Sequence, residues 1–142
     1  MSYLLDTCIL SKLRKIKVHP NEKLAEWFCK HLETQYFISV LSIGEIQKGI
    51  AKLEEADTKK KMILNDWLMG ELLPRFEGRV MEIDIHTNLI WGQMCGEAQK
   101  MGIQFPVIDS LLAASAIQHN FILVTENTKD FIHTGCRLHN PC

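Results

Sequence analysis

Short apolar runs rich in β-branched and aromatic residues alternate along this chain with longer segments whose apolar residues recur at helical spacing. The strand-like runs are SYLLD (2–6), YFISV (36–40), RVMEIDI (79–85) and FILVTE (121–126). Helical segments of ten or more residues separate them, which is the length that a crossover between parallel strands needs. The sequence therefore predicts an α/β fold with a mainly parallel central sheet and helices on both faces, a three-layer α/β/α arrangement.

The helical segments are bounded by residues that typically begin or end helices. They are TCILSKLRKI (7–16), NEKLAEWFCKHLE (21–33), LSIGEIQKGIAKLEEA (41–56), a long helix over about 58–73 that stops at Pro74, HTNLIWGQMCGEAQKMG (86–102) and FPVIDSLLAASAIQHN (105–120). FILVTE is expected to be the last clear strand. No linker divides the 142 residues, so one domain spanning 1–142 is predicted.

Acidic residues stand where the predicted strands end. Asp6 closes the first strand, and Glu126 and Asp130 follow the last one. Because ligands of open parallel sheets bind beyond the carboxyl ends of the strands, this edge is the expected site. Asp109 lies in one of the most apolar helices of the chain, which predicts that its carboxylate points into a shielded place.

Each candidate carboxylate also has a purely structural interpretation. Asp6 is a favoured N-cap residue, and Ser42 with Glu45 matches the S-x-x-E capping box. Asp109 fits the first turn of its helix, where negative charge meets the positive end of the dipole, and Asp130 suits a turn or a cap. Taken together, however, four such carboxylates near one edge of a sheet indicate a shared role.

Four carboxylates at one edge repel one another unless a cation neutralises them. Their hard oxygen ligands suit Mg²⁺ or Mn²⁺, which usually keep bound waters for a phosphate substrate. Asp84 also follows a strand, but its IDIHT context is typical of an ordinary helix start, so it is left out of the predicted site. The sequence thus predicts a magnesium or manganese site.

The composition and the motifs absent from the sequence argue against several other classes of protein. A net charge of −1 and a pI of about 6.6 argue against a broadly basic nucleic-acid binder, although basic clusters stand at 12–17 and 59–61. The five cysteines form no C-x-x-C pair, and with no signal peptide or long apolar span they indicate a cytoplasmic protein without a membrane partner. Zinc spacings, glycine-rich phosphate loops and a G-x-S-x-G elbow are absent from the sequence.

Six short sequence motifs follow one another along nearly the whole chain. They are LLDTCILS (4–11), ISVLSIGEIQKGI (38–50), LPRFEGRVMEID (73–84), FPVIDSLLAASAIQHN (105–120), LVTENTKDF (123–131) and the terminal NPC (140–142). In this set the sequence resembles the PIN-domain ribonucleases of the VapC toxin type, close to the FitB-like branch. Each motif is weak alone, and the ordered set is specific.

The resemblance implies a PIN-like fold and metal-dependent hydrolysis of RNA by a toxin of a toxin–antitoxin pair. The acidic site would consist of Asp6, Glu45, Asp109 and Asp130, with Asp6 and Asp109 as principal ligands of Mg²⁺ or Mn²⁺. Supporting polar residues would be Thr7, Thr125 and Asn127. Because RNA must approach an acidic pocket, a basic rim is expected, for which Lys12, Arg14, Lys15 and Lys48 are the candidates.

The same resemblance implies partners. Such toxins commonly form homodimers and assemble with a cognate antitoxin into heterotetramers or larger complexes, and operator DNA is bound only through the antitoxin. Two positions depart from the family: Glu126 stands where arginine or another nonacidic residue is frequent, and Cys142 where an aromatic residue is frequent. The first departure leaves open whether Glu126 joins the metal site.

Three other protein classes compete with this interpretation. A PIN-like protein- or nucleic-acid-binding module without catalysis is the main alternative, and the presence of all four carboxylates argues against it. A haloacid-dehalogenase-type phosphohydrolase needs a second aspartate where Cys8 stands. A receiver-like signalling domain needs paired acids at the first strand end, but Leu5 precedes Asp6.

Overall fold

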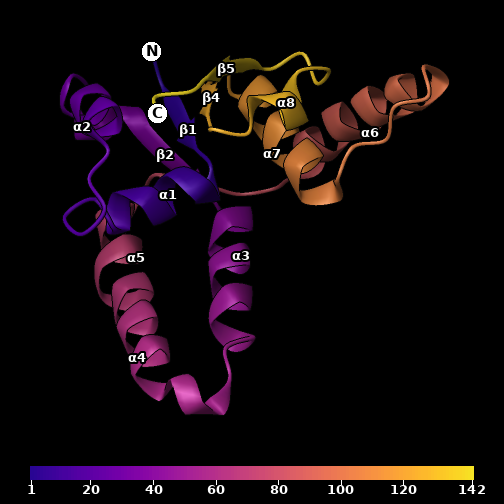
Figure 1. The fold of residues 1–142 in the computed structure, drawn as a ribbon. Coiled ribbons are helices and arrows are strands. Elements are labelled where there is room, and N and C mark those ends of the chain that lie inside the picture. The colour runs from indigo at the N-terminus through magenta and orange to yellow at the C-terminus, as the bar shows by residue number, and fades with distance from the viewer.

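A sheet of five parallel strands in the order β3-β2-β1-β4-β5 forms the centre of the molecule (Figure 1). The computed structural model describes all residues, 1–142. The strands are β1 (Tyr3–Leu5), β2 (Tyr36–Ser39), β3 (Val80–Met81), β4 (Ile122–Val124) and β5 (Arg137–His139). The predicted α/β class is confirmed, and the sheet is wholly rather than mainly parallel.

Eight α-helices connect the strands. They are α1 (Thr7–Arg14), α2 (Glu22–Cys29), α3 (Val40–Ala51), α4 (Thr58–Trp67), α5 (Leu73–Arg75), α6 (Ile85–Lys100), α7 (Val107–Gln118) and α8 (Thr128–Phe131). Figure 1 shows α3 and α4 extending away from the sheet as an arm, while α6 and α7 lie on the opposite side from α1 and α2. None of the helices combines the length and the apolar character needed to cross a membrane.

Side chains that alternate along the short strands pack against helices on both faces of the sheet. Leu5 and Val124 belong to a cluster of twelve buried residues with α1, α2, α3 and the segment around α5, whereas the adjacent Leu4 and Leu123 belong to a second cluster with α7 and α8. Successive side chains of a strand point to opposite faces, so each strand contributes to both cores. The three-layer α/β/α prediction is therefore confirmed.

The helix predicted to stop at Pro74 instead continues past it. A π-helical segment, Leu68–Leu72, follows α4, and the N–H of Leu73 donates to the carbonyl of Leu68 five residues earlier. Pro74 then lies inside α5. Proline has no N–H to donate and crowds the preceding turn, and the wider π turn accommodates it without ending the helical path.

Two elements near the C-terminus were missed, and one cap was placed wrongly. FILVTE is not the last strand, because β5 pairs in parallel with β4 after the single-turn helix α8. The N-cap of α3 is Ser39, whose hydroxyl accepts the N–H of Leu41, so the capping box that was the structural alternative for Ser42 and Glu45 does not form. Glu45 is thereby free for another contact.

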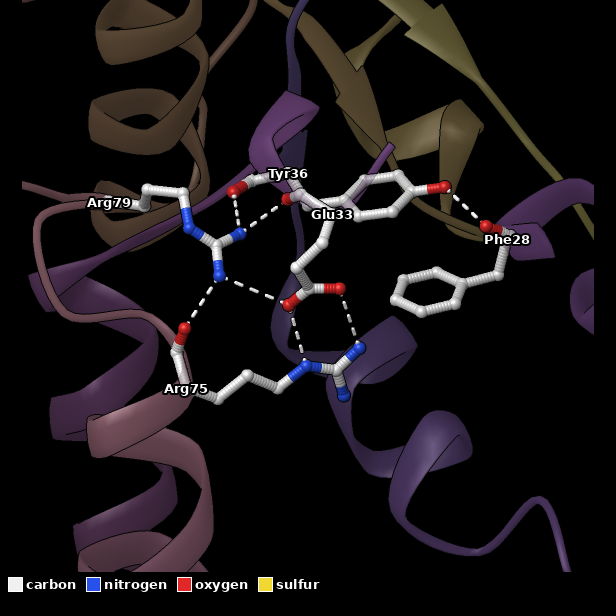
Figure 2. A network of polar contacts seen from close by, with 5 residues as sticks. All are labelled: Phe28, Glu33, Tyr36, Arg75 and Arg79. Atoms are coloured by element: carbon white, nitrogen blue, oxygen red, sulfur yellow. Dashed lines mark hydrogen bonds and ion pairs between the residues drawn. The ribbon is translucent and has the colours of Figure 1, made fainter. Parts of the chain in front are cut away.

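A network of polar contacts ties β2 to the segment before β3 (Figure 2). The guanidinium of Arg79 donates to the carbonyl oxygens of Glu33, Tyr36 and Arg75, and also to Oε1 of Glu33 at 3.0 Å. Arg75 makes a bidentate ion pair with Glu33, and the phenol of Tyr36 donates to the carbonyl oxygen of Phe28 at 2.6 Å. This network lies at the strand start of β2, the edge opposite the strand ends that carry the carboxylates.

Candidate active site

Asp6 lies directly after β1 and is almost fully buried, with 6% of its surface exposed. Leu5 is in register with Val124 of β4, so the next residues, Asp6 and Thr125, come side by side at the strand ends. The Thr125 hydroxyl donates to Asp6 Oδ2 at 2.8 Å, and the Thr7 N–H donates to Oδ1 at 2.7 Å. Asp6 is thus both the N-cap of α1 and a carboxylate held in one orientation.

Glu45 reaches the same strand ends from the second turn of α3. The Thr7 hydroxyl donates to Glu45 Oε1 at 2.7 Å and lies 3.0 Å from the hydroxyl of Ser42. Thr7 therefore joins the two acids, since its backbone binds Asp6 and its side chain binds Glu45. Figure 1 shows why these residues meet: α1, α3 and α7 all begin near the same end of the sheet.

Asp109 enters from the first turn of α7 and is half-buried. Burial raises the pKa of its carboxyl to about 6, and the negative charges of Asp6, Asp130 and Glu45 act in the same direction. All four predicted carboxylates are therefore close enough to interact electrostatically. The structure brings together the acidic residues that the sequence predicted as a group.

Asp130 and Asn127 are the more exposed members of the predicted site, and both lie at α8. Asn127 contributes through its backbone, because its N–H donates to the Thr125 hydroxyl at 3.0 Å. Thr125 is fully buried and accepts this bond while donating to Asp6. The contact of Asn127 with Thr125 is thus made by its backbone N–H and not by its side chain.

No cation of the chain compensates the four carboxylates. The ion pairs of the structure are Lys12 with Glu126, and Arg75 and Arg79 with Glu33. No three carboxylate, imidazole or thiol groups converge closely enough to form a ready metal cage. The donor set still fits a hard divalent cation, because the charges of Asp6, Glu45 and Asp130 act on Asp109 without a compensating cation of the chain, and Mg²⁺ completes its shell with water.

Two further residues contact the site without having been predicted. Ser42 is fully buried beside the Thr7 hydroxyl, and the thiol of Cys8 donates to Asp6 Oδ2 at 3.5 Å. Burial, followed by the charge of Asp6, raises the pKa of the Cys8 thiol to about 11, which keeps it protonated. The signal for Ser42 was present in its position one turn before Glu45, but it was interpreted as a cap.

Of the four candidate RNA-binding residues, two contact other side chains of the chain and two are exposed. Lys12 Nζ donates to Glu126 Oε2 at 2.7 Å, so Glu126 turns to α1 and is neutralised there. The guanidinium of Arg14 lies over the ring of Trp67, 5.7 Å from its centroid. Lys15 and Lys48 are exposed, and Lys48 lines a surface depression together with Glu45.

The raised pKa of Asp109 predicts a pH-dependent stability of the metal-free protein. An ordinary carboxyl has lost its proton by about pH 5, whereas folded Asp109 keeps its proton until about pH 6, so its ionisation makes unfolding easier as the pH rises through this window. Asp109→Asn is expected to increase the free energy of unfolding at about pH 7.5 by about 1 to 2 kcal/mol, allowing for solvent screening, and to have little effect at about pH 4.

Urea titrations of both proteins in the presence of a chelator measure this difference. A stability gain that is equal at both pH values would contradict the electrostatic origin and would instead indicate a packing effect of the amide.

A family model for the PIN domain matches residues 3–135. The chain belongs to the PIN domain family. This PIN domain is 29% identical over 138 residues to toxin FitB of Neisseria gonorrhoeae, covering 97% of this chain and 96% of that protein. It is 27% identical over 137 residues to VapC ribonuclease Y4jK of Sinorhizobium fredii, covering 96% and 95% of the two chains.

A solved structure, FitAB bound to an IR36 DNA fragment, contains a chain that superposes on this PIN domain with a TM-score of 0.86. The sequence identity is 28%, and the match covers 98% of this chain and 94% of the other. The likeness to the VapC and FitB group that the motifs indicated is confirmed.

Proposed function

We propose that this PIN domain is a metal-dependent endoribonuclease that acts as the toxin of a toxin–antitoxin pair. The observation that carries the proposal is the gathering of Asp6, Glu45, Asp109 and Asp130 at the strand ends without a compensating lysine or arginine. Its relatives of matching length include proteins named as a toxin and as a ribonuclease. The requirement for Mg²⁺ or Mn²⁺ is part of this proposal.

Asp6 and Asp109 are the proposed principal ligands. Asp6 is buried and fixed by Thr7 and Thr125, so it offers a preorganised oxygen. The elevated pKa of Asp109 reflects burial first and then the repulsion of the other carboxylates, and a bound cation would offset both. A bound divalent ion acidifies water and polarises the scissile phosphate. Glu45 and Asp130 are proposed to accept hydrogen bonds from the attacking water and to orient it.

The proposed reaction is hydrolysis of an RNA phosphodiester. The oxygen of the water forms a bond to phosphorus, the bond from phosphorus to the leaving ribose oxygen breaks, and the leaving oxygen takes up a proton from solvent water. Glu45 is proposed to receive the proton of the water; the proposal is supported by its second carboxylate oxygen, because Thr7 donates to Oε1 alone. Lys12, Arg14, Lys15 and Lys48 are proposed to contact the RNA backbone.

The proposed partners follow from the same relatives. A cognate antitoxin would cover the acidic site, and the protein would form a homodimer that assembles with it into a heterotetramer or a larger complex. Operator DNA would be bound through the antitoxin, in line with the FitAB structure, which holds a DNA fragment. A cytoplasmic location is also proposed; it agrees with five cysteines that are all free thiols in the structure.

Cleavage of a mixed RNA pool by the purified, antitoxin-free protein tests the proposal. We expect cutting with Mg²⁺ or Mn²⁺ and none with chelator. A folded protein that cuts no RNA with either ion, and binds neither in calorimetry, would favour the alternative of a PIN-like binding module without catalysis.

The support of Asp6 by Thr125 yields a further prediction. Thr125→Val keeps the volume but removes the hydroxyl that donates to Asp6, so metal affinity and cleavage at low Mg²⁺ are expected to fall by about 10- to 100-fold. Thr125→Ser, which keeps the hydroxyl, is the matched control and should retain most activity. A Mg²⁺ titration of the cleavage rate measures both; equal Mg²⁺ dependence of the valine and serine variants would refute the supporting role.

A further inference from the structure

A polar pocket of about 410 Å³ lies between α1 and the start of α2. Its lining residues are Ser11, Lys12, Lys15, His19, Pro20 and Asn21, and none except Pro20 has an apolar side chain. The proposed catalytic residues do not line this pocket. Two lysines, a histidine and a serine hydroxyl instead surround a space that suits an anion.

The turn that follows α1 builds the pocket. The N–H groups of Val18 and His19 both donate to the carbonyl of Lys15, at 2.9 and 2.7 Å, so the chain reverses directly after the helix. Asn21 then caps α2 by accepting the N–H of Leu24 at 3.0 Å. Residues 19–21 are thereby folded back against Ser11 and Lys15, and the pocket walls are held by backbone hydrogen bonds.

One stripe of α1 connects this pocket with the carboxylates. Thr7, Ser11 and Lys15 recur every four residues, so they lie on one face of the helix over an axial length of about 12 Å. A second depression, between α1, α3 and α4, is lined by Thr7 and Glu45 and also by Ser11 and Lys15. The two depressions share Ser11 and Lys15 and form one path away from the acidic site.

The charges along this path favour a polyanion. The strand-end carboxylates have no cationic partner in the chain, whereas Lys15 is exposed and makes no ion pair. Lys12, also on the pocket wall, is paired with Glu126 at 2.7 Å, so its charge is balanced within the chain and Lys15 is the unpaired cation of the pocket. A polyanion bound at the acidic site and lying along this face of α1 would meet the unpaired charge of Lys15.

We propose that this pocket is a subsite for a backbone phosphate of the RNA that flanks the scissile phosphate. Lys15 supplies the unpaired positive charge, and Ser11, His19 and the ammonium of Lys12 supply hydrogen bonds. The inference rests on the proposed ribonuclease function, because it gives the RNA a direction across the protein. Lys15 and His19 are binding residues of the subsite and take no part in the chemical step.

Binding and cleavage are measured separately, so that the subsite and the nuclease function are tested independently. Binding of a fluorescent single-stranded RNA to chelator-treated protein is followed by anisotropy at several salt concentrations. Lys15→Gln is expected to raise Kd about fivefold and to reduce the steepness of the salt dependence by about 0.7, the value for one lost phosphate contact. The double variant Lys15→Gln/His19→Gln should bind more weakly still.

Cleavage then supplies the kinetic signature. With Mg²⁺, Lys15→Gln should raise KM about fivefold on an RNA that spans a mapped cleavage position and leave kcat unchanged. Lys100→Gln, an exposed lysine at the end of α6, is the matched control and should equal the wild type in every assay.

The outcomes separate the two ideas. If the single and double variants bind RNA with the wild-type Kd and salt dependence, the subsite is refuted, whatever the nuclease does. If wild type binds RNA in a manner that depends on Lys15 but cuts none, the ribonuclease proposal fails and the subsite stands. If Lys15→Gln weakens binding of inorganic phosphate alone and not of RNA, the pocket takes a free anion and the inference is wrong.

Discussion

Replacing Asp6 with asparagine is expected to lower metal-dependent RNA cleavage by about 10³-fold with little change in folding. The amide keeps one oxygen for the N–H of Thr7 and so preserves the cap of α1, and the Thr125 hydroxyl can rotate to accept from the new NH₂ group. What is lost is a negative charge at the centre of the acidic group. Initial rates on a mapped RNA substrate, with circular dichroism as the folding check, measure the effect.

Asp84→Asn is the matched control for this experiment. Asp84 also follows a strand and caps a helix, since its Oδ1 accepts the N–H of Thr87 at 3.0 Å. It stands outside the acidic group, and the backbone hydrogen bond from Thr87 lowers its pKa to about 2. Its asparagine variant should cleave RNA at the wild-type rate; if both variants lose activity equally, the specific role of Asp6 is lost.

Removal of the Arg79 side chain should produce the largest loss of stability. Arg79→Ala leaves the carbonyl oxygens of Glu33, Tyr36 and Arg75 without their shared donor (Figure 2). It also removes a cation–π contact in which the guanidinium lies 4.7 Å from the ring centroid of Phe76. The Arg79 side chain is only 15% exposed. We expect a loss of about 3 kcal/mol in the free energy of unfolding, or about 10 °C in Tm.

Two further variants serve as comparisons for the stability loss of Arg79→Ala. Arg79→Lys keeps the charge but lacks the planar fork that reaches several oxygens at once, so an intermediate loss is expected. Arg137→Ala removes an exposed arginine that binds Asn120 and should cost less than about 1 kcal/mol. Urea denaturation measures all three proteins, and equal losses for Arg79→Ala and Arg137→Ala would contradict the clamp role of Arg79.

The spacing of apolar residues predicted most of the strands and helices, because each element must bury one or both of its faces in the core. The run at 2–6 and the run at 121–126 became neighbouring strands with alternate residues in two cores, as β-type alternation requires. The errors fell where long-range contacts override local preference. β5, residues 137–139, has only three residues and gains its strand conformation by pairing with β4.

Sequence patterns also did not identify which serine caps α3. Ser39 and Ser42 are both acceptable N-caps, and sequence alone does not choose between them. The strand β2 ends at Ser39, so α3 begins earlier than expected and Glu45 is released to bind Thr7. The two interpretations of Asp6, cap and site residue, are compatible: Oδ1 accepts the N–H of Thr7 at the cap, and Oδ2, which binds Thr125, is left for the proposed site.

By itself the sequence determined the α/β class, the placement of acids at strand ends and the family, because periodicity and motif order are properties of the chain. The tertiary structure alone decided which groups neutralise one another. It paired Glu126 with Lys12, left the four carboxylates without a cation and turned His19 back toward Lys15. Electrostatic interaction depends on distance through space, and residues 114 positions apart become partners only when the sheet brings the strand ends together.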